Sequence, residues 1–132
     1  MISLDTNILV RLLTNDEPQQ ASLALKALNQ AQADRQRIWV SVIVLCELVW
    51  VLQRLYGYDK AQVLVALGAL LAFAGLDVEH SPTVKKTLDE MRRSSADFAD
   101  ILLGQLSAER GAAFVLTFDK KAAKLGTHKL LA

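Results

Sequence analysis

Five acidic residues lie where a strand is expected to end, where a helix is expected to begin, or on a helix that faces the same edge of the sheet. They are Asp5, Glu47, Asp97, Asp100 and Asp119. Carboxylates that crowd together repel one another and raise one another's pKa, and a divalent cation removes that penalty. Carboxylate oxygens suit Mg²⁺, which keeps several of its waters, and Mn²⁺ is the alternative ion. The sequence therefore predicts an acidic site for a divalent cation.

Glu47 is the most informative of these acids, because its neighbours in the sequence are apolar. No other charged residue lies between Arg37 and Arg54. An unpaired buried carboxylate is very costly, so we expect Glu47 to be paired, protonated or bound to a cation. The alternative is that Glu47 lies on the one wet edge of an otherwise apolar helix.

Each of the other acids also has a purely structural interpretation. Asp5 and Asp119 can cap the helices that follow them. Asp97 and Asp100 are three residues apart near a helix start, where the helix dipole favours acids. Asp97 can also complete a capping box that begins at Ser94. The prediction of a metal site therefore depends on these acids acting together.

Short apolar stretches alternate with helical patterns along the chain. Strands are expected at residues 2–5, 38–40, 76–79 and 113–117, and a terminal strand can begin near residue 127. This alternation predicts an α/β layer structure with a largely parallel sheet. Ligands of such sheets bind beyond the carboxyl ends of the strands. Asp5 and Asp119 follow two of the expected strands at that end.

The chain has 132 residues, and we expect residues 1–132 to form a single domain. Its net charge of +1 gives no overall argument for nucleic acid, so RNA contacts would depend on local basic residues. A lone cysteine, Cys46, and the lack of a charged leader before an apolar run predict a cytoplasmic location. The uncharged stretch at residues 61–76 is shorter than the ~20 residues that span a bilayer, so no membrane segment is expected.

Four segments that contain the acids together resemble the PIN-domain family, and within it the VapC toxins of bacterial toxin–antitoxin pairs. The segments are Leu-Asp-Thr-Asn-Ile-Leu at 4–9, Glu-Leu-Val-Trp-Val-Leu at 47–52, Ala-Asp-Phe-Ala-Asp-Ile-Leu-Leu at 96–103 and Leu-Thr-Phe-Asp at 116–119. Their order and spacing make the resemblance fairly specific, whereas the first segment alone would be weak.

The resemblance implies a three-layer α/β/α fold with a short, mostly parallel central sheet of four to five strands. It also implies a magnesium-dependent endoribonuclease that acts as a toxin by cleaving RNA and inhibiting translation. By position, the catalytic and metal-binding acids carried over are Asp5, Glu47, Asp100 and Asp119, with Asp97 as an additional metal ligand. Asn7 and Thr117 match polar positions that support the site through hydrogen bonds.

The resemblance further implies a homodimer, a cognate antitoxin that blocks the site, and a structured RNA substrate such as transfer RNA. We expect Arg92, Arg93 and Lys120 to help hold RNA through its phosphates, the alternative being an ordinary solvated surface. Apolar residues such as Trp50 and those at 63–73 exceed the obvious needs of a small core. They can receive an antitoxin helix or a second protomer, or they can pack inside the domain.

Two other functions are compatible with the residues. A phosphoryl-transfer protein, either an acid-cluster phosphatase or a receiver domain, also uses magnesium and aspartates at strand ends. The phosphatase would need a second acid two residues after Asp5, where this sequence has Asn7. A non-catalytic helical binding module would use the same acids as caps and surface charges, and would not depend on a metal.

Overall fold

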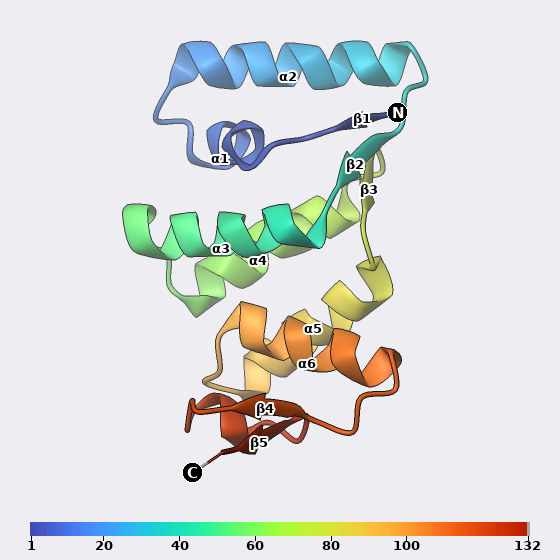
Figure 1. Ribbon diagram of the computed structural model, residues 1–132. Helices are drawn as coiled ribbons and strands as arrows, with labels where there is room; N and C mark the ends of the chain where they lie inside the picture. The colour runs from blue at the N-terminus through green and yellow to red at the C-terminus, as the bar shows by residue number, and fades with distance from the viewer. Residues whose placement is uncertain (132) are drawn as a thin grey trace. The chain divides into compact units, whose positions relative to one another are not determined.

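The computed structural model describes residues 1–131, which divide into two compact units between Glu79 and His80 (Figure 1). The first unit contains β1 (Ile2–Ser3), α1 (Thr6–Thr14), α2 (Pro18–Ala33), β2 (Ile38–Val40), α3 (Val42–Tyr56), α4 (Lys60–Ala72) and β3 (Leu76–Val78). The second unit contains α5 (Ser81–Arg93), α6 (Phe98–Glu109), β4 (Val115–Thr117), the 3₁₀ helix η1 (Ala122–Lys124) and β5 (His128–Leu130). No helix within residues 1–131 is long and apolar enough to cross a membrane.

Every strand pair described in residues 1–131 is parallel. The first unit has the strand order β1-β2-β3, in which Ile38 of β2 pairs with Ile2 on one side and Leu76 on the other. In the second unit β4 pairs with β5, with Leu116 opposite Lys129. The five short parallel strands agree with the predicted number. Where the sequence predicted one central sheet, the hydrogen-bonded pairs form a three-stranded sheet and a two-stranded sheet.

Polar caps set the ends of the helices in the first unit. The Ser41 hydroxyl accepts a hydrogen bond from the backbone N–H of Val44 (3.1 Å), and the Glu79 carboxylate accepts one from the N–H of Val42 (3.0 Å). Gly57 ends α3 with φ = 67°, a left-handed conformation that glycine adopts without strain. The core behind these helices includes the fully buried side chains of Leu9, Ile38, Leu45, Leu48, Leu52, Val63 and Leu67.

In the second unit, α6 approaches the segment before β5 too closely for any side chain at Gly104. A Cβ atom added there would lie 2.2 Å from the Thr127 Oγ1 atom and 3.0 Å from the His128 Cε1 atom. Phe98 and Ile101 are buried on the same helix. The close approach therefore fixes the start of β5 against the face of α6 one turn after Asp100.

Gly104→Ala is expected to destabilise the protein, because the new methyl group overlaps Thr127. Overpacking of this kind costs roughly 1–3 kcal/mol, which exceeds the gain of about 1 kcal/mol from alanine's better helix propensity. The matched control is Gly68→Ala in α4, where a Cβ atom meets nothing within 4 Å. That variant is expected to gain about 0.4–1 kcal/mol. Urea unfolding measures both, and equal stabilities of the two variants would contradict the close approach.

Candidate carboxylate site

The acids of the second unit gather at the start of α6 and in the loop after β4. Asp97 is the N-cap residue of α6, Asp100 lies in its first turn, and Asp119 follows β4 by two residues. Asp100 is half-buried, whereas Asp97 and Asp119 are exposed. Burial raises the pKa of Asp100, and the charges of Asp97 and Asp119 raise this pKa further, while His128 and Lys121 oppose the rise. Asp97 and Asp119 thus each lie close enough to Asp100 to disfavour its charge.

Asp119 is held by hydrogen bonds on both sides of its loop. Its Oδ1 atom accepts from the backbone N–H groups of Lys121 (2.8 Å) and Ala122 (3.2 Å), at the beginning of η1. Its own N–H donates to the Thr117 Oγ1 atom at 2.9 Å. Thr117 therefore fixes the backbone of Asp119, and Asp119 in turn fixes the turn that follows it.

Asp97 makes no capping hydrogen bond through its side chain. The predicted capping box between Ser94 and Asp97 is wrong, because the Ser94 hydroxyl accepts from the N–H of Ala96 (3.0 Å) and Asp97 is itself the N-cap residue. The Asp97 Oδ1 atom instead lies 3.7 Å from the Lys121 Nζ atom. This carboxylate is consequently available to a cation.

The predicted acids of the first unit are both exposed. Asp5 is the N-cap residue of α1, and its Oδ1 atom accepts from the Thr6 N–H at 2.8 Å. Glu47 shares the exposed face of α3 with Ile43 and Trp50, whose side chains are 69% and 56% exposed. Glu47 is therefore solvent-exposed, as the alternative of a wet helix face expects, and its binding to a cation stays a prediction. Asn7 is exposed in the first turn of α1.

Asp16, another acid of the first unit, has hydrogen-bond donors and an ion-pair partner around its carboxylate. The Tyr56 hydroxyl donates to the Asp16 carboxylate at 2.6 Å, the Thr14 hydroxyl donates at 2.9 Å, and Arg11 forms an ion pair at 3.3 Å. These contacts lower the pKa of Asp16, with the Tyr56 hydrogen bond as the largest cause. The Arg11 guanidinium, which lies close in sequence to the first motif, is thus committed to a structural network.

The basic residues expected to hold RNA differ in their surroundings. Arg92 and Arg93 each form an ion pair within α5, with Asp89 and Glu90 respectively. Lys120 directly follows Asp119 and is exposed. RNA phosphates would therefore compete with helix neighbours for the two arginines, but not for Lys120, which has no ion pair described within residues 1–131.

The donor chemistry of the acidic cluster fits a hard divalent cation. Within residues 1–131, no three acidic, histidine or cysteine side chains are close enough to hold one metal ion together. Mg²⁺ is nevertheless commonly bound through one or two carboxylates, with water and substrate phosphate completing its shell. The repulsion around Asp100 is the penalty that such a cation would relieve.

His128 and Lys121 border this cluster, and for His128 an isolated histidine in the sequence wrongly favours a surface position. His128 is only 8% exposed, its Nδ1 atom lies 2.9 Å from the Thr127 hydroxyl, and its Nε2 atom is buried with no partner described in residues 1–131. A histidine in a three-residue strand has no local pattern that reveals burial. Only the close approach at Gly104, a contact between distant residues, places it there.

Comparisons with known proteins found a matching family and a similar solved structure. The model of the PIN domain family matches residues 2–127, which includes parts of both compact units. Among solved structures, the chain is similar to one described as Mycobacterium tuberculosis VapC20, a toxin that cleaves the Sarcin-Ricin loop. The identity is 16%, 96% of each chain is covered, and the TM-score is 0.43. No curated protein matches the chain.

Tyr56→Phe is expected to lower the stability of the protein at neutral pH, because ionised Asp16 loses its strongest hydrogen bond. A carboxyl group with a lowered pKa stabilises the fold above its unfolded pKa of about 3.9, and this stabilisation is lost as the pH falls through the folded pKa. The difference between wild type and variant should therefore shrink below about pH 4. Urea unfolding across this pH range measures it, and a difference that does not change with pH would contradict the assignment.

Proposed function

The chain belongs to the PIN-domain family, and from that membership we propose that it is a metal-dependent endoribonuclease of the VapC toxin type. The family match over residues 2–127 carries this proposal. It also confirms the predicted α/β/α PIN-like fold class, and its coverage of both compact units supports a single nuclease domain over residues 1–132. The reaction would hydrolyse RNA phosphodiesters in the cytoplasm and so inhibit translation.

The proposed catalytic set is the group of acids that match the family's motifs by position. It consists of Asp5, Glu47, Asp100 and Asp119, with Asp97 as an additional metal ligand. The effect of Asp97 and Asp119 on Asp100 supports this assignment, because a cation can relieve the penalty on the charge of Asp100. The exposure of Glu47 also supports it, because an exposed carboxylate is accessible to a cation and to a substrate.

Mg²⁺, or Mn²⁺ in its place, would offset the charge of the phosphodiester and favour ionisation of the attacking water. The chain itself contributes the orientation of its carboxylates. Asp5 and Asp119 each use Oδ1 to accept backbone N–H groups, which holds the carboxylate in one direction. Thr117 holds the backbone of Asp119, and Asn7 is proposed to support Asp5 from the first turn of α1.

Structured RNA such as transfer RNA is the proposed substrate. Lys120 is the basic residue best placed for a phosphate, because it is exposed and adjacent to Asp119. Arg92 and Arg93 are proposed to assist by exchanging their partners on α5 for phosphate oxygens. Binding through these three residues would weaken as the salt concentration rises.

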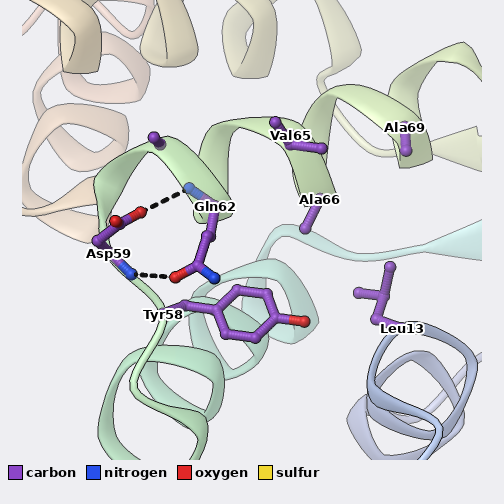
Figure 2. A pocket seen from close by; sticks show the side chains of 8 residues that line it. Leu13, Tyr58, Asp59, Gln62, Val65, Ala66 and Ala69 are labelled. Atoms are coloured by element: carbon purple, nitrogen blue, oxygen red, sulfur yellow. Dashed lines mark hydrogen bonds between the residues drawn. The ribbon is translucent and has the colours of Figure 1, made fainter.

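A cognate antitoxin and a homodimer complete the proposal, and an apolar groove of the first unit supports it. The groove has a volume of about 510 Å³ and is lined by Leu13 of α1, by Tyr58, and by α4 residues that include Val65 and Ala69 (Figure 2). Only part of the apolar region at residues 63–73 is surplus to the core, because Val63, Ala66, Leu67 and Leu70 are buried. We assign the groove to an antitoxin helix, since the α4 residues that line it are uncharged and Asp59 adds one acid at its end.

Val65→Glu tests this assignment, because Val65 is 73% exposed and its replacement should not unfold the protein. The variant is expected to keep its melting temperature but to lose co-purification with the antitoxin encoded beside it. The control is Leu23→Glu in α2, where Leu23 is 67% exposed and lies outside this groove. Unchanged co-purification of the Val65 variant would overturn the assignment. A dimer that becomes a monomer in light scattering would assign the groove to the second protomer instead.

Cleavage of total RNA by the purified chain tests the proposed function. Cleavage is expected with Mg²⁺ and should disappear with EDTA. Asp5→Asn should abolish cleavage without loss of stability, because asparagine caps a helix as well as aspartate does. Asp5→Ala should also be inactive but less stable by about 1 kcal/mol, because it loses the cap as well. Cleavage that persists in EDTA, or in the asparagine variant, would refute the proposed mechanism.

A further inference from the structure

Lys121 contacts two acids of the cluster and acts electrostatically on the third. Its backbone N–H donates to the Asp119 Oδ1 atom at 2.8 Å, and its Nζ atom lies 3.7 Å from the Asp97 Oδ1 atom. Its positive charge opposes the rise in the pKa of Asp100. One residue thus joins the loop after β4 to the start of α6.

The ion pair between Lys121 and Asp97 is a poor candidate for a structural role. Both side chains are more than half exposed, at 52% and 68% respectively, and the separation is long for a salt bridge. Exposed pairs of this kind contribute little to stability. The same properties make the pair easy to exchange, since a lysine ammonium on a flexible stem can return to water at low cost.

We propose that Lys121 is a built-in counter-cation of the acidic cluster, pairing with Asp97 until a divalent cation displaces it. This inference rests on the proposed function, because it requires the cluster to bind a divalent cation. The backbone N–H of Lys121 stays on Asp119 in both states, so only the ammonium group moves. Lys121 is therefore a positioning residue that keeps the cluster partly neutral before the metal arrives.

The proposal predicts how removal of the ammonium group changes the affinity for a divalent cation. Without the ammonium group, a divalent cation has no competitor for Asp97, and it meets one less positive charge as it arrives. Both effects act in the same direction, so a neutral residue at this position should tighten metal binding. A purely structural lysine would leave the affinity unchanged or weaken it.

Titration of the full chain with Mn²⁺, followed by electron paramagnetic resonance without RNA, tests this role. Lys121→Met and Lys121→Gln keep the backbone hydrogen bond to Asp119, and both are expected to bind Mn²⁺ roughly two- to five-fold more tightly than wild type, the range set by an exposed ion pair. Lys121→Arg keeps the charge and should bind like wild type. The matched control is Lys124→Met in η1, which removes an equal charge from a side chain with no ion pair described in residues 1–131.

Two unfavourable results are distinguishable. The first result is that Lys121→Met and Lys121→Gln bind Mn²⁺ with the same affinity as Lys124→Met. This result would overturn the role of Lys121 and leave the proposed function standing. A wild-type chain that binds no Mn²⁺ would overturn the proposed metal dependence, and the role of Lys121 with it.

Discussion

The repulsion that Asp97 and Asp119 exert on Asp100 is the constraint on which the proposed chemistry depends. Charges that repel one another stay together only if stronger interactions hold them. Here Phe98 and Ile101, on either side of Asp100, are almost fully buried, and each contributes roughly 1.5–3 kcal/mol. Burial on one face of the helix therefore fixes Asp100 near Asp97 and Asp119, although their mutual repulsion opposes that position.

The capping and catalytic interpretations of the acids are compatible. Asp5 and Asp119 each accept backbone N–H groups through Oδ1, so both are structural caps as the simpler interpretation requires. A carboxylate has two oxygens and about four lone-pair sites, so one cap does not exhaust it. The cap gives the carboxylate a fixed direction, which a metal ligand or catalytic group needs. Structural use of an acid is therefore no evidence against a chemical role.

The sequence predicted the parts of this structure that local patterns determine. The caps at Asp5 and Asp119 and the end of α3 at Gly57 follow from residue types that favour those positions. The sequence left open whether Glu47 is exposed, because α3 is apolar on both faces and the sequence does not show which face the core covers. The burial of His128 depends on a contact with α6 near Gly104, more than twenty residues earlier, which no local pattern encodes.

Two acids of this chain show how surroundings separate a structural carboxylate from a candidate functional one. Asp16 accepts hydrogen bonds from Tyr56 and Thr14 and pairs with Arg11, so its charge is stabilised and its pKa is lowered. Asp100 has other acids as neighbours, and its pKa is raised. Ionised Asp16 is therefore favoured by the fold, whereas ionised Asp100 is disfavoured by it. A divalent cation would therefore add little stabilisation at Asp16. At Asp100 it would supply the positive charge that the fold provides only in part.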